Sequence, residues 1–153
     1  MAKEYYSSPE EVIRYTGIQP GDIGIQLVDG DGYESEEEKL KAVLENWLEQ
    51  TKDLIDQHRN RDYHKEVEDG ERDKIPPGIH HIALRIAANM VAVANMRRQT
   101  PIVKIDDFQV DMVEDKVFTK NIRRDLKLYP RKTTPQTFGM FVVNTDPEDN
   151  EEG

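Results

Sequence analysis

Two stretches of the sequence place apolar residues at steps of three and four, which is the spacing of one face of an α-helix. The first predicts a long amphipathic helix over about 36–58, with an apolar face of Leu40, Val43, Leu44, Trp47, Leu48, Thr51, Leu54 and Ile55. The second opens at Pro76-Pro77-Gly78, should end near Arg98, and has an apolar face of Ile79, Ile82, Ala83, Ile86, Ala87, Met90, Val93 and Ala94. Two complete apolar faces can bury each other, so we expect a mainly α protein with a small helical bundle.

Helix-starting and helix-breaking residues delimit the rest of the N-terminal half. Ser8-Pro9-Glu10-Glu11 combines an N-cap serine, a proline at the first helical position and a capping-box glutamate, which predicts a short helix stopped at Gly17. Ser35-Glu36-Glu37-Glu38 repeats the capping box ahead of the long helix. Residues 17–34 hold too many glycines and prolines for a regular element, so we expect an ordered or semi-ordered loop. The polar residues 59–75 lack an apolar period and predict a linker or mobile loop.

The apolar period changes after Pro101. Ile102 to Ile105 and Phe108 to Met112 predict two strands of a minor β-hairpin, with Asp106-Asp107 as its turn. A helical period then returns from about Asp115 to Leu128. We therefore expect one helical domain over residues 1–130, including the 17–34 and 59–75 loops, and an extended C-terminal tail over 131–153.

Charge is divided unevenly along the 153 residues. The net charge is −10 over residues 1–74, +5 over 75–135 and −5 over 136–153. The overall charge of −10 opposes general binding to nucleic-acid phosphates. Only 36% of the residues are hydrophobic and 34% are charged, which disfavours a large buried-sheet enzyme. The chain has no cysteine and no apolar run near the ~20 residues of a membrane span, so we expect no thiol chemistry and no membrane partner.

No catalytic, metal or cofactor site is predicted. His58, His64, His80 and His81 lack the four-residue spacing of a zinc-binding pair, and we expect them to face solvent or cap helices. Asp29-Gly30-Asp31-Gly32 lacks the glycine and glutamate that an EF-hand needs further along and predicts an ordinary turn. Phosphate loops, nucleophile elbows and His-Glu-x-x-His helices are also missing. We therefore expect a protein that is not an enzyme.

Two candidate partner-binding regions remain. The first is a basic stretch with seven cations and one anion in 17 residues: Lys116, Lys120, Arg123, Arg124, Lys127, Arg131 and Lys132. It is either a solvated helix face or a docking surface for an acidic partner. The second is the apolar part of the tail, Phe138, Met140, Phe141, Val142 and Val143, which either folds back as a last strand or adds a strand to another subunit.

The order of elements resembles the head-tail connector, or adaptor, proteins of tailed double-stranded DNA viruses. The resemblance covers roughly residues 5–130 and is carried by Tyr6-Ser7-Ser8-Pro9-Glu10-Glu11-Val12, helix 36–58 with its polar loop, Ala-Leu-Arg-Ile-Ala-Ala-Asn-Met at 83–90, Ile105-Asp106-Asp107-Phe108-Gln109-Val110 and Asp125-Leu126-Lys127-Leu128-Tyr129. The 17–34 loop and the acidic tail have no match in that pattern.

This resemblance implies a structural virion protein at the head-tail interface, assembled in the host cytoplasm. It implies a twelve-fold ring beneath the portal that extends the DNA channel and carries the tail or stopper protein, with DNA passing through without specific binding. The C-terminal region would contact the portal protein. The alternative is a DNA-binding transcriptional regulator that uses 115–132 as a basic recognition helix. The acidic net charge and the long 59–75 segment oppose that alternative.

Overall fold

The structure is a computed structural model that describes residues 5–97, 101–103 and 116–131. Its elements are α1 (Pro9–Thr16), the 3₁₀ turn η1 (Pro20–Ile23), α2 (Glu36–Arg59), α3 (Tyr63–Glu68), α4 (Pro77–Met96) and α5 (Lys120–Leu126). The described part is mainly α and contains no β-strand. Its one β-type pairing is an isolated parallel bridge between Ile25 and Ile102. Phe108, the expected hairpin turn and the tail lie outside the described residues.

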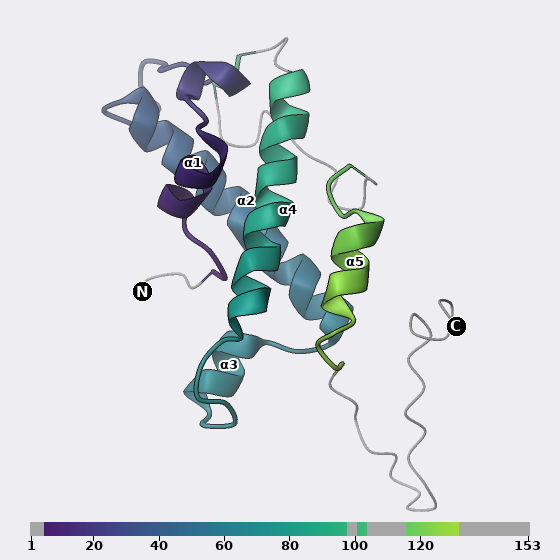
Figure 1. Cartoon of the computed structure of the whole chain (residues 1–153). Helices are drawn as coiled ribbons and strands as arrows, with labels where there is room; N and C mark the ends of the chain where they lie inside the picture. Colours follow the sequence, from purple (N-terminus) through teal and green to yellow (C-terminus); the bar gives the residue numbers. More distant parts are fainter. Residues whose placement is uncertain (1–4, 98–100, 104–115, 132–153) are drawn as a thin grey trace, which may run out of the picture.

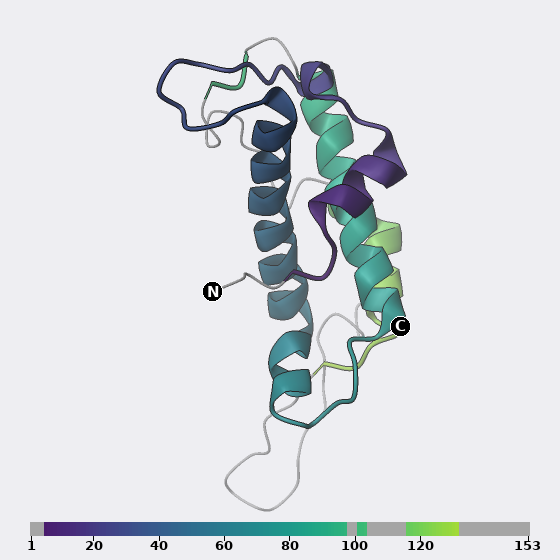
Figure 2. The ribbon, with the colours of Figure 1, turned by 90° about the vertical axis from the view of Figure 1, so that its left-hand side faces the viewer.

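Helix α4 is the centre of the domain. It packs against α2, α1 and α5; α2 crosses behind α4 in Figure 1, while α5 lies beside α4, and Figure 2 shows α2 and α4 side by side. The expected apolar faces form the core: Trp47 is 2% exposed, and Ile55, Ile79, Ile86 and Met90 are fully buried. The long helices therefore bury each other as their sequence spacing predicts.

The predicted helix starts are confirmed in their serine caps. Ser8 Oγ accepts a hydrogen bond from the Glu11 N–H at 3.2 Å, and Ser35 Oγ accepts one from the Glu38 N–H at 3.1 Å. Gly17 ends α1 in the left-handed region, with φ of 69°. The glutamates depart from the capping-box expectation, because Glu38 accepts from the Glu34 N–H, one residue before the cap, while Glu11 pairs with a histidine of α4.

The prediction of a linker or mobile loop over 59–75 is wrong at its centre, where α3 forms. Asp62 caps this helix by accepting from the Lys65 N–H at 3.1 Å, and Tyr63 and Glu66 are buried. The 17–34 segment is an ordered loop, as expected. It also contains the regular 3₁₀ turn η1, which its many glycines and prolines did not lead us to expect. Ile18, Ile23 and Ile25 tie this loop to the core.

The helix expected over 115–128 is shorter in the structure. It begins after Thr119, whose Oγ1 accepts from the Ile122 N–H at 3.2 Å, and it contains seven residues. Val117 and Phe118 are buried in the turn before it. The apolar spacing was correct because Ile122 and Leu126 are buried, but a side-chain cap sets the start of the helix.

Candidate functional site

Helix α5 carries three of the six described residues of the basic stretch, Lys120, Arg123 and Arg124, and is fixed on α4 by buried side chains. Ile122 is 1% exposed and Leu126 is fully buried. Arg85 of α4 donates to Asp125 at 2.6 Å, and this hydrogen bond holds the pKa of Asp125 below its ordinary value. The Asn89 side chain donates to the Val117 carbonyl at 3.0 Å. The single anion of the basic stretch is therefore used to attach α5.

The end of the basic segment is attached to α2 and to the start of α4. Arg59, a fully buried residue at the end of α2, donates to the Tyr129 carbonyl at 3.1 Å. The Tyr129 hydroxyl lies over Gly78, where a Cβ atom would come within 1.6 Å of it. Glycine at this position therefore leaves room for the tyrosine that follows α5.

This attachment divides the basic residues into two groups. Lys116, Lys120 and Arg124 are exposed, whereas Arg123, Lys127 and Arg131 are half-buried. Arg123 lies over the Phe118 ring, 5.7 Å from its centroid. Lys132 and the apolar tail residues Phe138, Met140, Phe141, Val142 and Val143 lie outside the described residues. Lys120 and Arg124 are four residues apart and share one side of α5, and Lys116 is exposed in the turn before it; we call these three residues the basic face (Lys116, Lys120 and Arg124).

A buried polar cluster, which the sequence analysis missed, joins the N-terminal segment to the end of α2. The Tyr6 hydroxyl donates to Asp56 and accepts from the Tyr63 N–H at 3.0 Å. Lys52 forms ion pairs with Asp56 at 2.6 Å and with Asp62 at 3.1 Å. Burial and the bond to Asp56 raise the pKa of Tyr6 far above its ordinary value. Burial also raises the pKa of Asp56, although Lys52 and Tyr6 oppose that rise.

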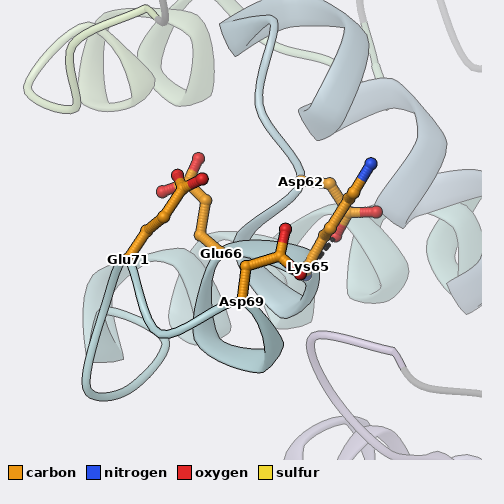
Figure 3. Close-up of a pocket in the computed structure, with 5 residues that line it drawn as sticks. All are labelled: Asp62, Lys65, Glu66, Asp69 and Glu71. Atoms are coloured by element: carbon orange, nitrogen blue, oxygen red, sulfur yellow. Dashed lines mark hydrogen bonds between the residues drawn. The ribbon is translucent and has the colours of Figure 1, made fainter.

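Beside this cluster lies a hollow of about 160 Å³, lined by residues of α3 and its flanks (Figure 3): Asp62, Lys65, Glu66, Asp69 and Glu71. The buried Glu66 accepts from Arg61 at 3.3 Å and from Arg72 at 3.2 Å. These guanidinium groups neutralise the one buried carboxylate of the hollow. Across the described ranges, no three histidine, aspartate or glutamate side chains are grouped to hold a metal ion.

Lys39 is a second buried charged group that was not predicted. Its ammonium is fully buried and donates to the Gln26 carbonyl at 2.6 Å and the Val103 carbonyl at 2.7 Å, and it pairs with Asp31 at 3.1 Å. It joins the 17–34 loop to the segment after α4. A sequence signal exists, because Lys39 lies four residues before Val43 and Arg59 four after Ile55. Both buried cations thus continue the apolar face of α2 at its ends.

The expectation that the histidines face solvent or cap helices holds for the exposed His81, whereas His64 and His80 are partly exposed and also make long-range contacts. His64 Nε2 lies 2.9 Å from the Tyr5 carbonyl, and its ring stacks on Tyr6. His80 bridges the Tyr6 carbonyl and Glu11, each at 2.6 Å. These histidines hold the N-terminal segment against the helices.

Comparisons with protein-family models, with curated proteins and with solved structures found no match to this chain. Among the described helices, none has the length and apolar character needed to cross a membrane.

Proposed function

We propose that the protein is a structural virion protein, a head-tail adaptor that forms a ring, twelve-fold by resemblance, between the portal and the tail or stopper protein. The observation that carries the proposal is the basic face, which buried contacts with α4 hold outward on an otherwise acidic domain. A rigid helical domain that presents separated charges suits repeated docking within an assembly. DNA would pass along the ring channel without specific binding, because the summed acidic charge repels phosphates.

In this proposal the helices form the folded domain and the C-terminal tail binds a partner. α2 and α4 bury their apolar faces and pack against each other. The apolar residues of the tail, Phe138 and Met140 to Val143, would add to a partner by strand pairing and contact the portal or a neighbouring subunit. Polar residues flank that stretch, which favours pairing with another subunit over packing alone on a small surface.

The test is attachment to DNA-filled capsids that carry a portal but lack this protein, taken from the virus whose genome encodes the chain. Co-sedimentation should show binding to these capsids, and electron microscopy should place the added density at the portal vertex. Capsids assembled without a portal are the matched control and should not bind.

The second part of the attachment test uses a variant that lacks residues 133–153. It should keep its helical circular dichroism signal and cooperative melting while losing attachment. Equal binding to capsids with and without a portal would contradict the proposal. Loss of cooperative melting in the truncated chain would instead show that the tail belongs to the core.

A further inference from the structure

The outward side of α2 is as strongly acidic as the outward side of α5 is basic. Its exposed positions are Glu36, Glu37, Glu38, Lys41, Glu45, Glu49, Asp53 and Gln57, six of the eight being carboxylates. Glu38, Glu45, Glu49 and Asp53 follow one another at steps of seven, four and four, which places them along one line of the helix. At ~1.5 Å per residue this line is about 22 Å long. We call it the acidic face (Glu38, Glu45, Glu49 and Asp53).

The acidic and basic faces lie on two different helices, α2 and α5. Both helices pack against α4, and α2 crosses behind α4 in Figure 1. Two residues at the end of α2 contact the α5 region: His58 packs against Phe118, and the buried Arg59 donates to the Tyr129 carbonyl. Neither residue belongs to the acidic face.

The basic face has complementary charge and an apolar side chain at its end. Lys120 and Arg124 are four residues apart on α5, and Leu128, 78% exposed, follows four residues later. Asp125 is the one acidic residue between residues 116 and 131, and it is half-buried between Arg85 and Arg124. No exposed carboxylate of this segment therefore opposes the basic face. An exposed leucine beside cations is typical of an interface with an apolar centre and a charged rim.

We propose that the basic face of one copy docks on the acidic face of α2 in the next copy. The chain itself presents both complementary surfaces, on two different helices, so a second copy is the partner that the charges favour. Such a head-to-tail contact uses two different surfaces and closes into a ring when the rotation between copies allows it. The inference rests on the proposed ring and assigns the surfaces that form it.

The test uses reversed charges on each face. The acidic-face variant carries Glu45→Lys and Asp53→Lys, and the basic-face variant carries Lys120→Glu and Arg124→Glu. Because like charges then oppose each other at every contact, each variant alone should weaken self-association by ~10-fold or more. An equimolar mixture of the two should assemble again, because each reversed face meets its complement on the other variant.

Assembly is measured by mass photometry and sedimentation velocity at about 50 mM and about 500 mM salt, since screening should weaken an ionic contact. Control variants change the net charge equally at exposed positions outside both faces: Glu68→Lys with Asp73→Lys, and Arg14→Glu with Lys74→Glu. These controls should assemble like the parent. Circular dichroism checks that every variant is folded.

Three results would overturn the inference: a parent protein that remains monomeric at high concentration in low salt, face variants that assemble normally, or folded variants whose mixture fails to assemble. The capsid assay separates this inference from the proposed function. Salt-sensitive, complementable assembly without attachment to portal-bearing capsids would retain the inference and reject the adaptor. Attachment by both face variants at the parent's level would reject the inference and retain the adaptor.

Discussion

The two tyrosines of the polar cluster have opposite hydrogen-bonding states. The Tyr6 hydroxyl bonds both Asp56 and the Tyr63 N–H, whereas the Tyr63 hydroxyl is buried without a partner. Tyr6→Phe should therefore lower the free energy of unfolding by about 1–3 kcal/mol, because a buried carboxylate loses a donor. Tyr63→Phe should leave stability unchanged or slightly higher. Urea unfolding compares the pair, and an equal loss in both variants would contradict the assigned contacts.

Asp31 makes stability depend on acid pH. Hydrogen bonds from the Val28 and Tyr33 N–H groups, together with Lys39, hold the pKa of Asp31 below its ordinary 3.8. A carboxyl with a lowered folded pKa stabilises the protein fully above the unfolded value, and this contribution is lost as the pH falls through the folded pKa. Asp31→Asn should flatten the decline in melting temperature below about pH 4. Asp29→Asn, in the same exposed turn, serves as the control and should keep the parent's slope.

At the scale of elements, the junction of α4 with the end of α5 depends on one glycine. Gly78→Ala would place a methyl group on the Tyr129 hydroxyl and force the ring away. We expect a lower melting temperature and faster amide exchange in α5, despite the higher helix propensity of alanine. In a Tyr129→Ala background the same substitution should be neutral or stabilising. Destabilisation of similar size in both backgrounds would show that crowding by Tyr129 is not the cause.

The sequence predicted α1, α2 and α4 because each has a cap or a breaker at its ends and an apolar period long enough to define a face. α3 was not predicted because a helix of six residues is too short to show a repeating apolar spacing. Its stability comes from the Asp62 cap and from the hydrogen bond between Tyr6 and Tyr63, which are 57 residues apart. The buried polar contacts of Lys39 and Arg59 were missed for the same reason: long-range packing decides whether a charged residue on an apolar face turns inward.

The candidate site was predictable in composition but not in shape. Counting charges located the basic segment, yet only packing against α4 determines that Lys120 and Arg124 face outward while Arg123 covers Phe118. The acidic face of α2 was not predicted, and its relation to α5 depends on how three helices pack. Tertiary packing, which local spacing does not encode, supplied that relation.

At the scale of the whole molecule, the balance of charge predicts weak binding to duplex DNA. The basic face carries few cations on a chain of net charge −10, and long-range repulsion is least screened at low salt. Fluorescence anisotropy at about 50 mM salt, where the Debye length is ~14 Å, should show no tight binding. The acidic-face variant is an informative control, since removing negative charge should raise any affinity. Tight, salt-sensitive binding by the parent would favour the transcriptional regulator.

The buried ammonium of Lys39 has a consequence for how the domain opens. It bonds carbonyls on both sides of the Ile25–Ile102 bridge, where the Ile102 N–H donates to Gly24 and the Gln26 N–H donates to Ile102. If either the Gln26 segment or the Val103 segment moves away, the Lys39 ammonium loses one of its carbonyl acceptors. The two segments should therefore open as one cooperative unit. In native-state hydrogen exchange the Gln26 and Ile102 amides should share one opening free energy and one denaturant dependence. Lys39→Met should lower that shared opening free energy, because the two segments lose the ammonium that bonds to both of them.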